Sequence, residues 1–174
     1  MIRRGWALGG ALALLVVANT AVASTFIAMD LPELAASSDA VVRGEILSVR
    51  AFWDPDHRVI LTDARVRIDE RLAGDVGQAG AVISIRTFGG TVGDYQVVAH
   101  GFPTFEAGAE AVLFVRRAAD RTLQVTGYQL GHYEVLVRGG VEVVVPTFDG
   151  GSVLVGVDGR KIDGPVTLAL DELR

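Results

Sequence analysis

Residues 58–72, RVILTDARVRIDERL, alternate between apolar and polar side chains. In an extended chain Val66 and Ile68 would face one side, whereas Arg65 and Arg67 would face the other. A period of two residues predicts a β-strand with one buried face. Because the run is long and regular, we expect it to form a main strand of a β-sheet.

The segments around this run also indicate strands. Residues 40–53, AVVRGEILSVRAFW, are rich in β-branched and aromatic residues, and the turn DPDH at 54–57 joins them to the first run. Residues 111–115 are continuously apolar, as in a strand buried on both faces. Further strands are expected at 81–88, 91–99, 122–129, 131–138 and 141–148, with turns at the glycine pair 139–140 and the Asp-Gly steps 149–151 and 158–159.

Only the ends of the folded chain suggest helices. Asp30, Pro32 and Glu33 have the spacing of a helix start with a capping box, which predicts a short helix at 31–38. A second short helix is expected within 164–174, capped by Thr167. No helix-length segments separate the strands, so the sequence predicts an all-β barrel or sandwich, with 139–164 as an additional C-terminal hairpin region.

The first 23 residues have the pattern of a secretory signal peptide. Arg3 and Arg4 precede a short apolar stretch, and AVA at 21–23 is a small-residue cleavage site. The apolar stretch is shorter than the roughly 20 residues that span a bilayer, although an uncleaved anchor is the alternative. We therefore expect a signal peptide at 1–23, a single β-barrel domain at 24–174, a secreted or periplasmic location and no membrane insertion after cleavage.

Composition excludes several classes of function. Without the leader, 14 basic and 21 acidic residues leave a net charge near −7, and no Lys/Arg run is longer than two residues. A nucleic-acid partner is therefore not expected, because phosphate backbones require a basic surface. The chain has no cysteine, which removes thiol nucleophiles, thiolate metal sites and disulfide stabilisation.

The glycine-rich stretch IRTFGGTVGDYQVVAHGFPTF, 85–105, resembles neither a phosphate loop nor a dinucleotide fingerprint. Its glycines have neither the spacing of a phosphate loop nor that of a dinucleotide fingerprint, and no Lys follows them. The next segment also predicts a strand rather than a helix. We expect a bend followed by a surface loop. Such loops often carry binding residues, so the candidate contact residues are the following: Tyr95, His100, Phe102 and Phe105. Packing on the barrel is the alternative role for these side chains.

No catalytic constellation is evident. His57, His100 and His132 are far apart in sequence and have no metal-binding spacing, and Ser152 lacks the glycine pattern of a nucleophile elbow. A hydrolase with a carboxylate pair could use Glu106 and Glu110, which lie on either side of Gly108. We therefore predict no catalytic residue, no metal site and no cofactor.

Several motifs resemble a widespread family of exported bacterial proteins of uncharacterised function. They are Ser38-Asp39 to Gly44, Ile60 to Thr62, Leu72 to Gly74, Gly89-Gly90, Phe105 to Glu110, and Gly127 to Tyr133. Ala73 and Ala109 depart from the family pattern. The strand and turn pattern is also similar to OB-like barrels of the netrin-module and metalloproteinase-inhibitor kind. The resemblance implies an OB-like antiparallel barrel and export, and it implies no activity. The inhibitors' N-terminal cysteine is absent, so their mechanism does not carry over.

The expected function is a non-enzymatic module that binds a protein or a glycan in the cell envelope or outside the cell. Two alternatives remain open. One is a protease inhibitor that uses an exposed loop, and the other is a hydrolase with a carboxylate or histidine site.

Overall fold

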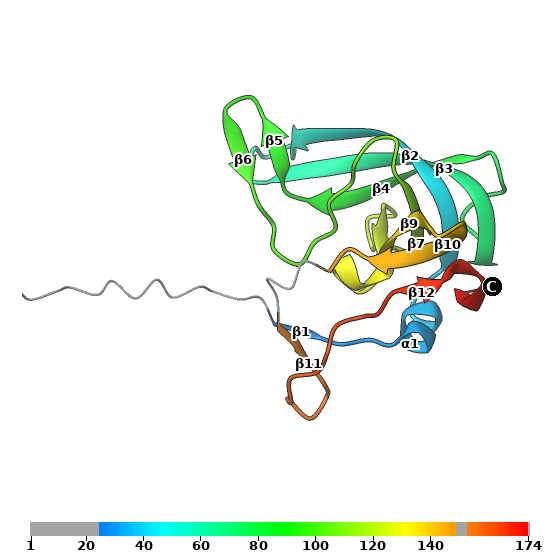
Figure 1. Ribbon diagram of the computed structural model, residues 1–174. Helices are drawn as coiled ribbons and strands as arrows, with labels where there is room; N and C mark the ends of the chain where they lie inside the picture. The colour runs from blue at the N-terminus through cyan, green and yellow to red at the C-terminus, as the bar shows by residue number, and fades with distance from the viewer. Residues whose placement is uncertain (1–24, 149–152, 174) are drawn as a thin grey trace, which may run out of the picture.

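The computed structural model describes residues 25–148 and 153–173, which fold as an all-β protein with short helices (Figure 1). The expected leader at 1–23, the whole of the expected turn at 149–151 and Ser152 lie outside these residues. The strands are β1 (Thr25–Ile27), β2 (Ala40–Trp53), β3 (Ile60–Gly74), β4 (Val82–Phe88), β5 (Gly90–Val92), β6 (Tyr95–Val97), β7 (Glu110–Arg117), β8 (Leu123–Val125), β9 (His132–Arg138), β10 (Val141–Pro146), β11 (Val153–Val155) and β12 (Leu168–Ala169); the helices are α1 (Leu31–Ala36) and the 3₁₀ turns η1 (Tyr128–Gly131) and η2 (Leu170–Leu173).

Five strands close into a barrel. β2 pairs with β3, β3 with β4, β4 with β8 and β8 with β7, and β7 returns to β2. Every pairing is antiparallel except β4–β8, where Ile85 lies beside Leu123 in parallel. This closed arrangement of five strands confirms the predicted OB-like barrel, with one parallel contact that the sequence did not indicate.

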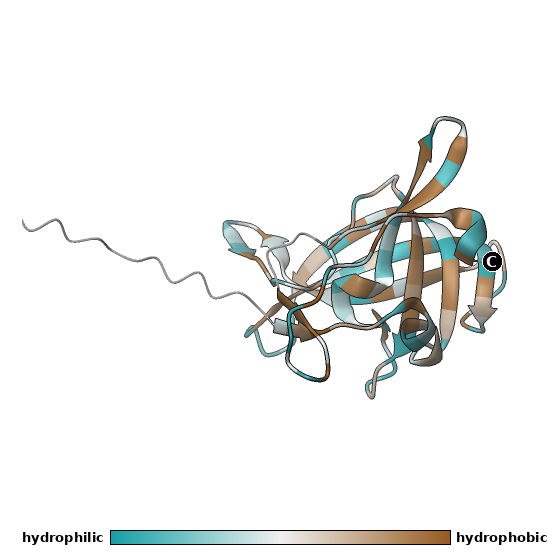
Figure 2. Ribbon diagram, turned by 60° about the horizontal axis from the view of Figure 1, so that its bottom comes forward, coloured by the Kyte–Doolittle hydropathy of each residue, from teal (hydrophilic) through white to brown (hydrophobic). Residues whose placement is uncertain are grey.

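The alternation in β3 arises from the two faces of the barrel wall. Val66 and Ile68 are fully buried inside the barrel, whereas Arg65 is exposed. Hydrophobic and hydrophilic residues follow one another along the strands in Figure 2. β2 has three register shifts against β3, and such irregularities bend and twist a strand so that it can follow the curved wall.

β7 separates two hydrophobic cores. Leu113 and Val115 face the barrel interior, whereas Val112 and Phe114 face a second core outside the barrel. The predicted burial of both faces of 111–115 is therefore confirmed. One long edge of β7 pairs with β2, and the other is shared between β9 and β8. β9, β10 and β12 extend the sheet beyond the barrel and carry the second core.

The N-terminal helix forms where the sequence predicts it. The Asp30 carboxylate accepts from the backbone N–H of Glu33 at 2.8 Å, and the Glu33 carboxylate accepts from that of Asp30 at 3.1 Å. This capping box fixes the start of α1. The helix ends at Ala36, two residues earlier than predicted, and Leu34 anchors it in the second core.

The C-terminal segment differs from the prediction. The β9–β10 hairpin around Gly139 and Gly140 is confirmed, but the expected short helix within 164–174 is present only as the 3₁₀ helix η2 and does not begin at Thr167. β12 pairs with β10 instead, and only the 3₁₀ turn η2 follows. Pairing along the edge of β10 and burial of Leu170 outweigh the weak helix signal of this short segment. β11 pairs in parallel with β1, which was also not predicted.

The glycine-rich stretch is a bend, as predicted. Gly89, Gly90 and Gly93 all have positive φ, which glycine adopts without steric cost. The expected strand at 91–99 is wrong in one respect, because the chain turns at Gly93-Asp94 and forms the β5–β6 hairpin. This hairpin stands at one end of the barrel in Figure 1.

Candidate functional site

Four aromatic rings form a continuous line at the end of the barrel that carries the glycine-rich bend. The ring centroids of Phe88 and Phe102 are 5.0 Å apart, those of Phe102 and Tyr128 are 4.9 Å apart, and those of Tyr128 and Phe26 are 5.3 Å apart. Phe88 is 43% exposed and Tyr128 is 42% exposed. We call these four residues the aromatic line. Tilted and edge-to-face contacts of this kind stabilise ring pairs and hold their geometry.

A groove of about 220 Å³ lies beside the aromatic line. Phe88 and Phe102 contribute to its wall, together with Val97, Val98 and His100. Val97 and Val98 are both exposed, so the groove joins the rings to form one apolar surface. Large exposed apolar surfaces on soluble proteins commonly mark interaction sites.

The loop that carries Phe102 is held against the barrel. Gly101 and Pro103 are buried, and their carbonyl oxygens accept hydrogen bonds from the Gln129 N–H at 3.0 Å and the Thr87 hydroxyl at 3.2 Å. Gly101 has φ +82°, and a Cβ there would lie 2.0 Å from the ring of Phe26. Only glycine lets the loop pass this close to Phe26, so the loop fixes one end of the aromatic line.

Trp53 and Tyr95 form a second aromatic contact at the same end of the barrel. Their centroids are 5.6 Å apart in an edge-to-face arrangement, and Tyr95 is 65% exposed. Tyr95 begins β6, whose three residues are all exposed. Among the strands in the described residues, β6 pairs only with β5. Its outer edge therefore offers backbone donors and acceptors to another chain.

The four predicted contact residues occupy different environments. Tyr95 and His100 are exposed, and Phe102 is half-buried in the aromatic line. Phe105 is 8% exposed and belongs to the barrel core. Three of the four residues therefore lie on accessible surface, while Phe105 supports the loop from below.

Sequence reasoning missed Phe26, Phe88, Tyr128 and Trp53. Phe88 directly precedes Gly89, so its place at the bend was available as a weak signal. Tyr128 has φ +59° directly after Gly127, which also has a positive φ. A tyrosine in the left-handed region is uncommon, and no sequence pattern predicts it. Its ring position depends on this backbone conformation, which turns the chain from β8 into η1.

His132 is buried where β9 begins. Its side chain is 2% exposed, and its ring centroid lies 5.1 Å from that of Phe105. Neither ring nitrogen has a hydrogen-bond partner within the described residues. Burial lowers the pKa of His132 to about 4, because the charged form would lose its hydration. At neutral pH the imidazole is therefore uncharged.

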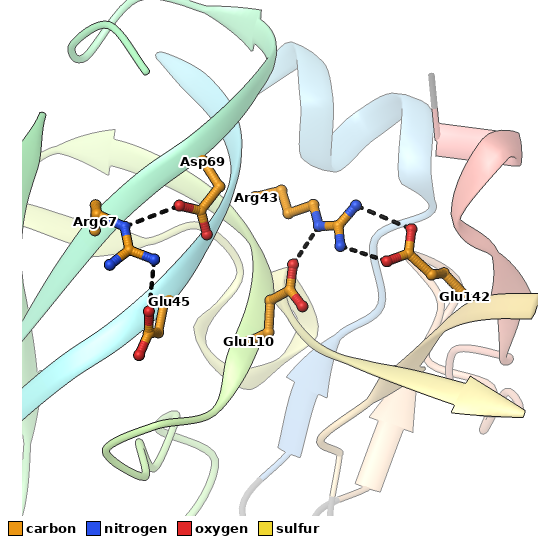
Figure 3. A network of polar contacts seen from close by, with 6 residues as sticks. All are labelled: Arg43, Glu45, Arg67, Asp69, Glu110 and Glu142. Atoms are coloured by element: carbon orange, nitrogen blue, oxygen red, sulfur yellow. Dashed lines mark hydrogen bonds and ion pairs between the residues drawn. The ribbon is translucent and has the colours of Figure 1, made fainter. Parts of the chain in front are cut away.

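Two arginine side chains on the outer face of the barrel each form ion pairs with two carboxylates (Figure 3). The Arg43 guanidinium donates to Glu110 on β7 and binds both carboxylate oxygens of Glu142 on β10, at 2.6 and 3.0 Å. These hydrogen bonds, with Glu110 first, raise the pKa of Arg43 above its usual range. Arg67 likewise contacts Glu45 and Asp69 at 2.6 and 3.0 Å.

The three histidines lie apart from one another in the part of the chain that the structure describes. His57 lies in the turn after β2, His100 on the groove, and His132 inside the protein. No group of three or more His, Asp or Glu side chains among these residues could hold a metal ion. Glu110 is bound to Arg43, and Glu106 is exposed in the preceding loop. The geometry offers aromatic and apolar contact instead.

The sequence matches no model of a known protein family, and no curated protein matches it either. None of the helices in residues 25–148 and 153–173 has the length and apolar character needed to cross a membrane.

Proposed function

We propose that this protein is an exported, non-enzymatic OB-like module that binds a protein or a glycan, in the periplasm or outside the cell. Its contact surface is the aromatic line together with the adjoining groove and β6. The observation that carries this proposal is the continuous run of four aromatic rings, two of them more than 40% exposed, at one end of the barrel.

A protein partner is favoured over a glycan by what adjoins the rings. Val97 and Val98 extend the surface with aliphatic side chains, which bury well against apolar groups of another protein. The outer edge of β6 can pair with an extended segment of a partner, and its backbone hydrogen bonds would add to the affinity. A glycan site would instead rely mainly on the open ring faces and on polar side chains around them.

The inhibitor alternative receives no specific support from the loop. A loop that enters a protease cleft has to project from its domain, whereas residues 98–105 lie against the barrel. Gly101, Pro103 and Phe105 are buried at alternate positions along it. The binding surface therefore consists of side chains beside the loop rather than a projecting backbone.

The test is capture of a partner by variants of the surface. Purified protein is immobilised and exposed to extracts of the cell envelope and to culture medium from the source cells. Val98→Asp introduces a charge into the groove, and Tyr128→Asn removes a ring while keeping a residue that tolerates positive φ. Val137→Asp is the matched control, because Val137 is 70% exposed on β9, outside the surface.

The expected result is a partner that wild type and Val137→Asp capture and that the two surface variants lose. All four proteins must unfold at similar denaturant concentrations, so that lost capture reports contact and not stability. A partner captured equally by all four would contradict the proposed surface. Treatment of the extract with protease or with periodate then distinguishes a protein from a glycan.

A further inference from the structure

A second hollow shares no lining residue with the aromatic line or with the groove beside it. The segment that enters α1 and the segment that enters β12 run side by side below the sheet of β9 and β10 (Figure 1). Between them is a groove of about 580 Å³, which we call the terminal groove. This volume falls within the range of roughly 300–1,000 Å³ that is typical of small-molecule sites.

The floor of the terminal groove and part of its walls are apolar. Leu130 and Leu154 come from the second core and form its floor. Met29 and Leu31 line one wall, and the opposite wall carries Val166, which is 65% exposed. An apolar ligand would cover side chains that otherwise face water, and this burial would favour binding.

One polar side chain faces this apolar floor without a partner. Tyr133 lines the groove and is only 2% exposed, yet its hydroxyl makes no hydrogen bond within the described residues. Among the described residues, two side-chain polar atoms are fully buried and lack a hydrogen-bond partner, and both are nitrogens of His132. The Tyr133 hydroxyl also lacks a partner but is not one of these atoms. It is therefore not fully buried, and it opens onto the groove.

The hydroxyl remains a donor at neutral pH. Burial raises the pKa of Tyr133 to about 12, because a phenolate would be poorly solvated there. A mostly buried tyrosine normally places its hydroxyl against a hydrogen-bond partner. An oxygen atom of a ligand in the groove would supply that partner.

Three exposed residues of the lining carry negative charge. Asp30, Glu33 and Asp163 line the groove, and none of its lining residues is Lys or Arg. Asp30 and Glu33 accept hydrogen bonds from uncharged backbone N–H groups, so their charges are not neutralised by these contacts. Three carboxylates without a cation attract a positively charged group and repel an anion.

We propose that the terminal groove binds a single-chain amphiphile with a positively charged head and an oxygen atom next to its apolar chain. The chain lies on Leu130 and Leu154, the oxygen accepts from the Tyr133 hydroxyl, and the head lies among the three carboxylates. This site is distinct from the surface proposed for partner binding, so each proposal can fail without the other.

The test uses three probes with the same twelve-carbon acyl chain. Dodecanoylcholine has a cationic head, monododecanoylglycerol a neutral head, and dodecanoate an anionic head. Each is titrated into the purified protein by calorimetry below its micelle concentration. We expect one molecule of dodecanoylcholine per chain and an affinity at least tenfold higher than that of dodecanoate, with the neutral ester between them. Added salt should reduce this preference.

Variants locate the site. Val166→Trp should fill the groove and abolish binding, whereas Val157→Trp, at a 97% exposed position outside the groove, should leave it unchanged. Tyr133→Phe should weaken both esters about threefold to tenfold, as expected for one lost hydrogen bond. Asp163→Asn should reduce the preference for the cationic probe and leave the neutral probe unaffected.

Three results would overturn the proposal. Absence of dodecanoylcholine binding at concentrations up to its micelle limit is the first. Equal affinity for all three probes, or tighter binding of dodecanoate, would contradict the role of the carboxylates. Binding that survives Val166→Trp would place the ligand elsewhere. Circular dichroism and unfolding curves of each variant confirm that the fold is retained, and Val157→Trp controls for the added indole ring.

Discussion

Val112 and Leu113 are consecutive residues of β7, and their side chains lie in two different hydrophobic cores. Both are fully buried. β7 is thus the wall that the barrel core and the second core share. Because both cores pack on β7, neither core can unfold without disrupting the strand on which the other core depends. The barrel and the layer of β9, β10 and β12 should therefore unfold together.

Leu113→Ala should lower the free energy of unfolding by about 3 kcal/mol, because it opens a cavity in a closed core. Val112→Ala should cost less, since it removes a smaller side chain. In urea unfolding, fluorescence and far-ultraviolet circular dichroism should give one coincident transition for both variants. Two separate transitions in either variant would contradict the coupling of the cores through β7.

The burial of the His132 side chain leads us to expect a loss of stability in mild acid. The pKa of its imidazole is about 4 in the folded protein and about 6.5 in an unfolded chain. Between these values the unfolded state binds a proton that the folded state does not bind. The free energy of unfolding should therefore fall as pH decreases from about 6.5 to 4, by up to about 3 kcal/mol.

His132→Phe should remove most of this pH dependence. Phenylalanine fills a similar volume beside Phe105 and leaves no unpaired nitrogen in the core. Urea unfolding of the wild type and of the variant at several pH values between 4 and 7.5 measures the difference. His100→Gln, at an exposed position in the groove, is the control. If the free energy of unfolding fell equally with decreasing pH in the wild type and in His132→Phe, burial of His132 would not be the cause of the lower stability in acid.

Arg43 and Arg67 form a matched pair for a test of ion pairing. Each contacts two carboxylates, but the Arg43 side chain is 15% exposed and the Arg67 side chain 43%. Arg43→Ala should cost about 2 kcal/mol, because Glu110 and Glu142 would remain close together without a cation. Arg67→Ala should cost clearly less, because exposed ion pairs are screened by solvent and contribute little.

Denaturant unfolding of both variants measures the two costs. A double-mutant cycle of Arg43→Ala with Glu142→Gln then isolates the contact between β2 and β10. Equal losses of unfolding free energy in Arg43→Ala and Arg67→Ala would contradict the importance of burial at Arg43. A coupling energy near zero between Arg43 and Glu142 would contradict it as well.

Gly101 should tolerate no side chain. Gly101→Ala combines a positive φ with a Cβ 2.0 Å from the Phe26 ring, so we expect a loss of more than 2 kcal/mol. Gly93→Ala is the control, since it has φ +58° and no atom within 4 Å of its added Cβ. It should cost about 1 kcal/mol, the strain of the backbone alone. Similar unfolding midpoints for the two variants would contradict the close packing of Phe26 on the loop.

Local patterns predicted the long strands well. The alternation around Val66 and the apolar run ending at Val115 identified β3 and β7, and the Asp30 capping box located α1. These features depend on neighbouring residues, so a single sequence reports them. The C-terminal segment was predicted only in part, because β12 depends on tertiary pairing with β10, which local sequence does not report.

The candidate site was only partly predictable. Tyr95, His100 and Phe102 belong to one loop region, and its glycines draw attention to it. Phe88 and Tyr128 join the aromatic line through barrel closure, which brings the ends of β4 and β8 together. The inward position of Phe105 follows from the path of the loop and not from its composition. The orphaned nitrogens of His132 and the open hydroxyl of Tyr133 likewise depend on contacts between distant strands.

The parallel pairing of β1 with β11 has a consequence for the order in which the chain assembles. Thr25 lies beside Val153, so the first described strand has no partner until nearly the whole polypeptide has been synthesised. Such distant pairings form late, because closing a long loop is entropically costly. β1 therefore stays unpaired until residues 153–155 have been made, so it is among the last strands to join the fold.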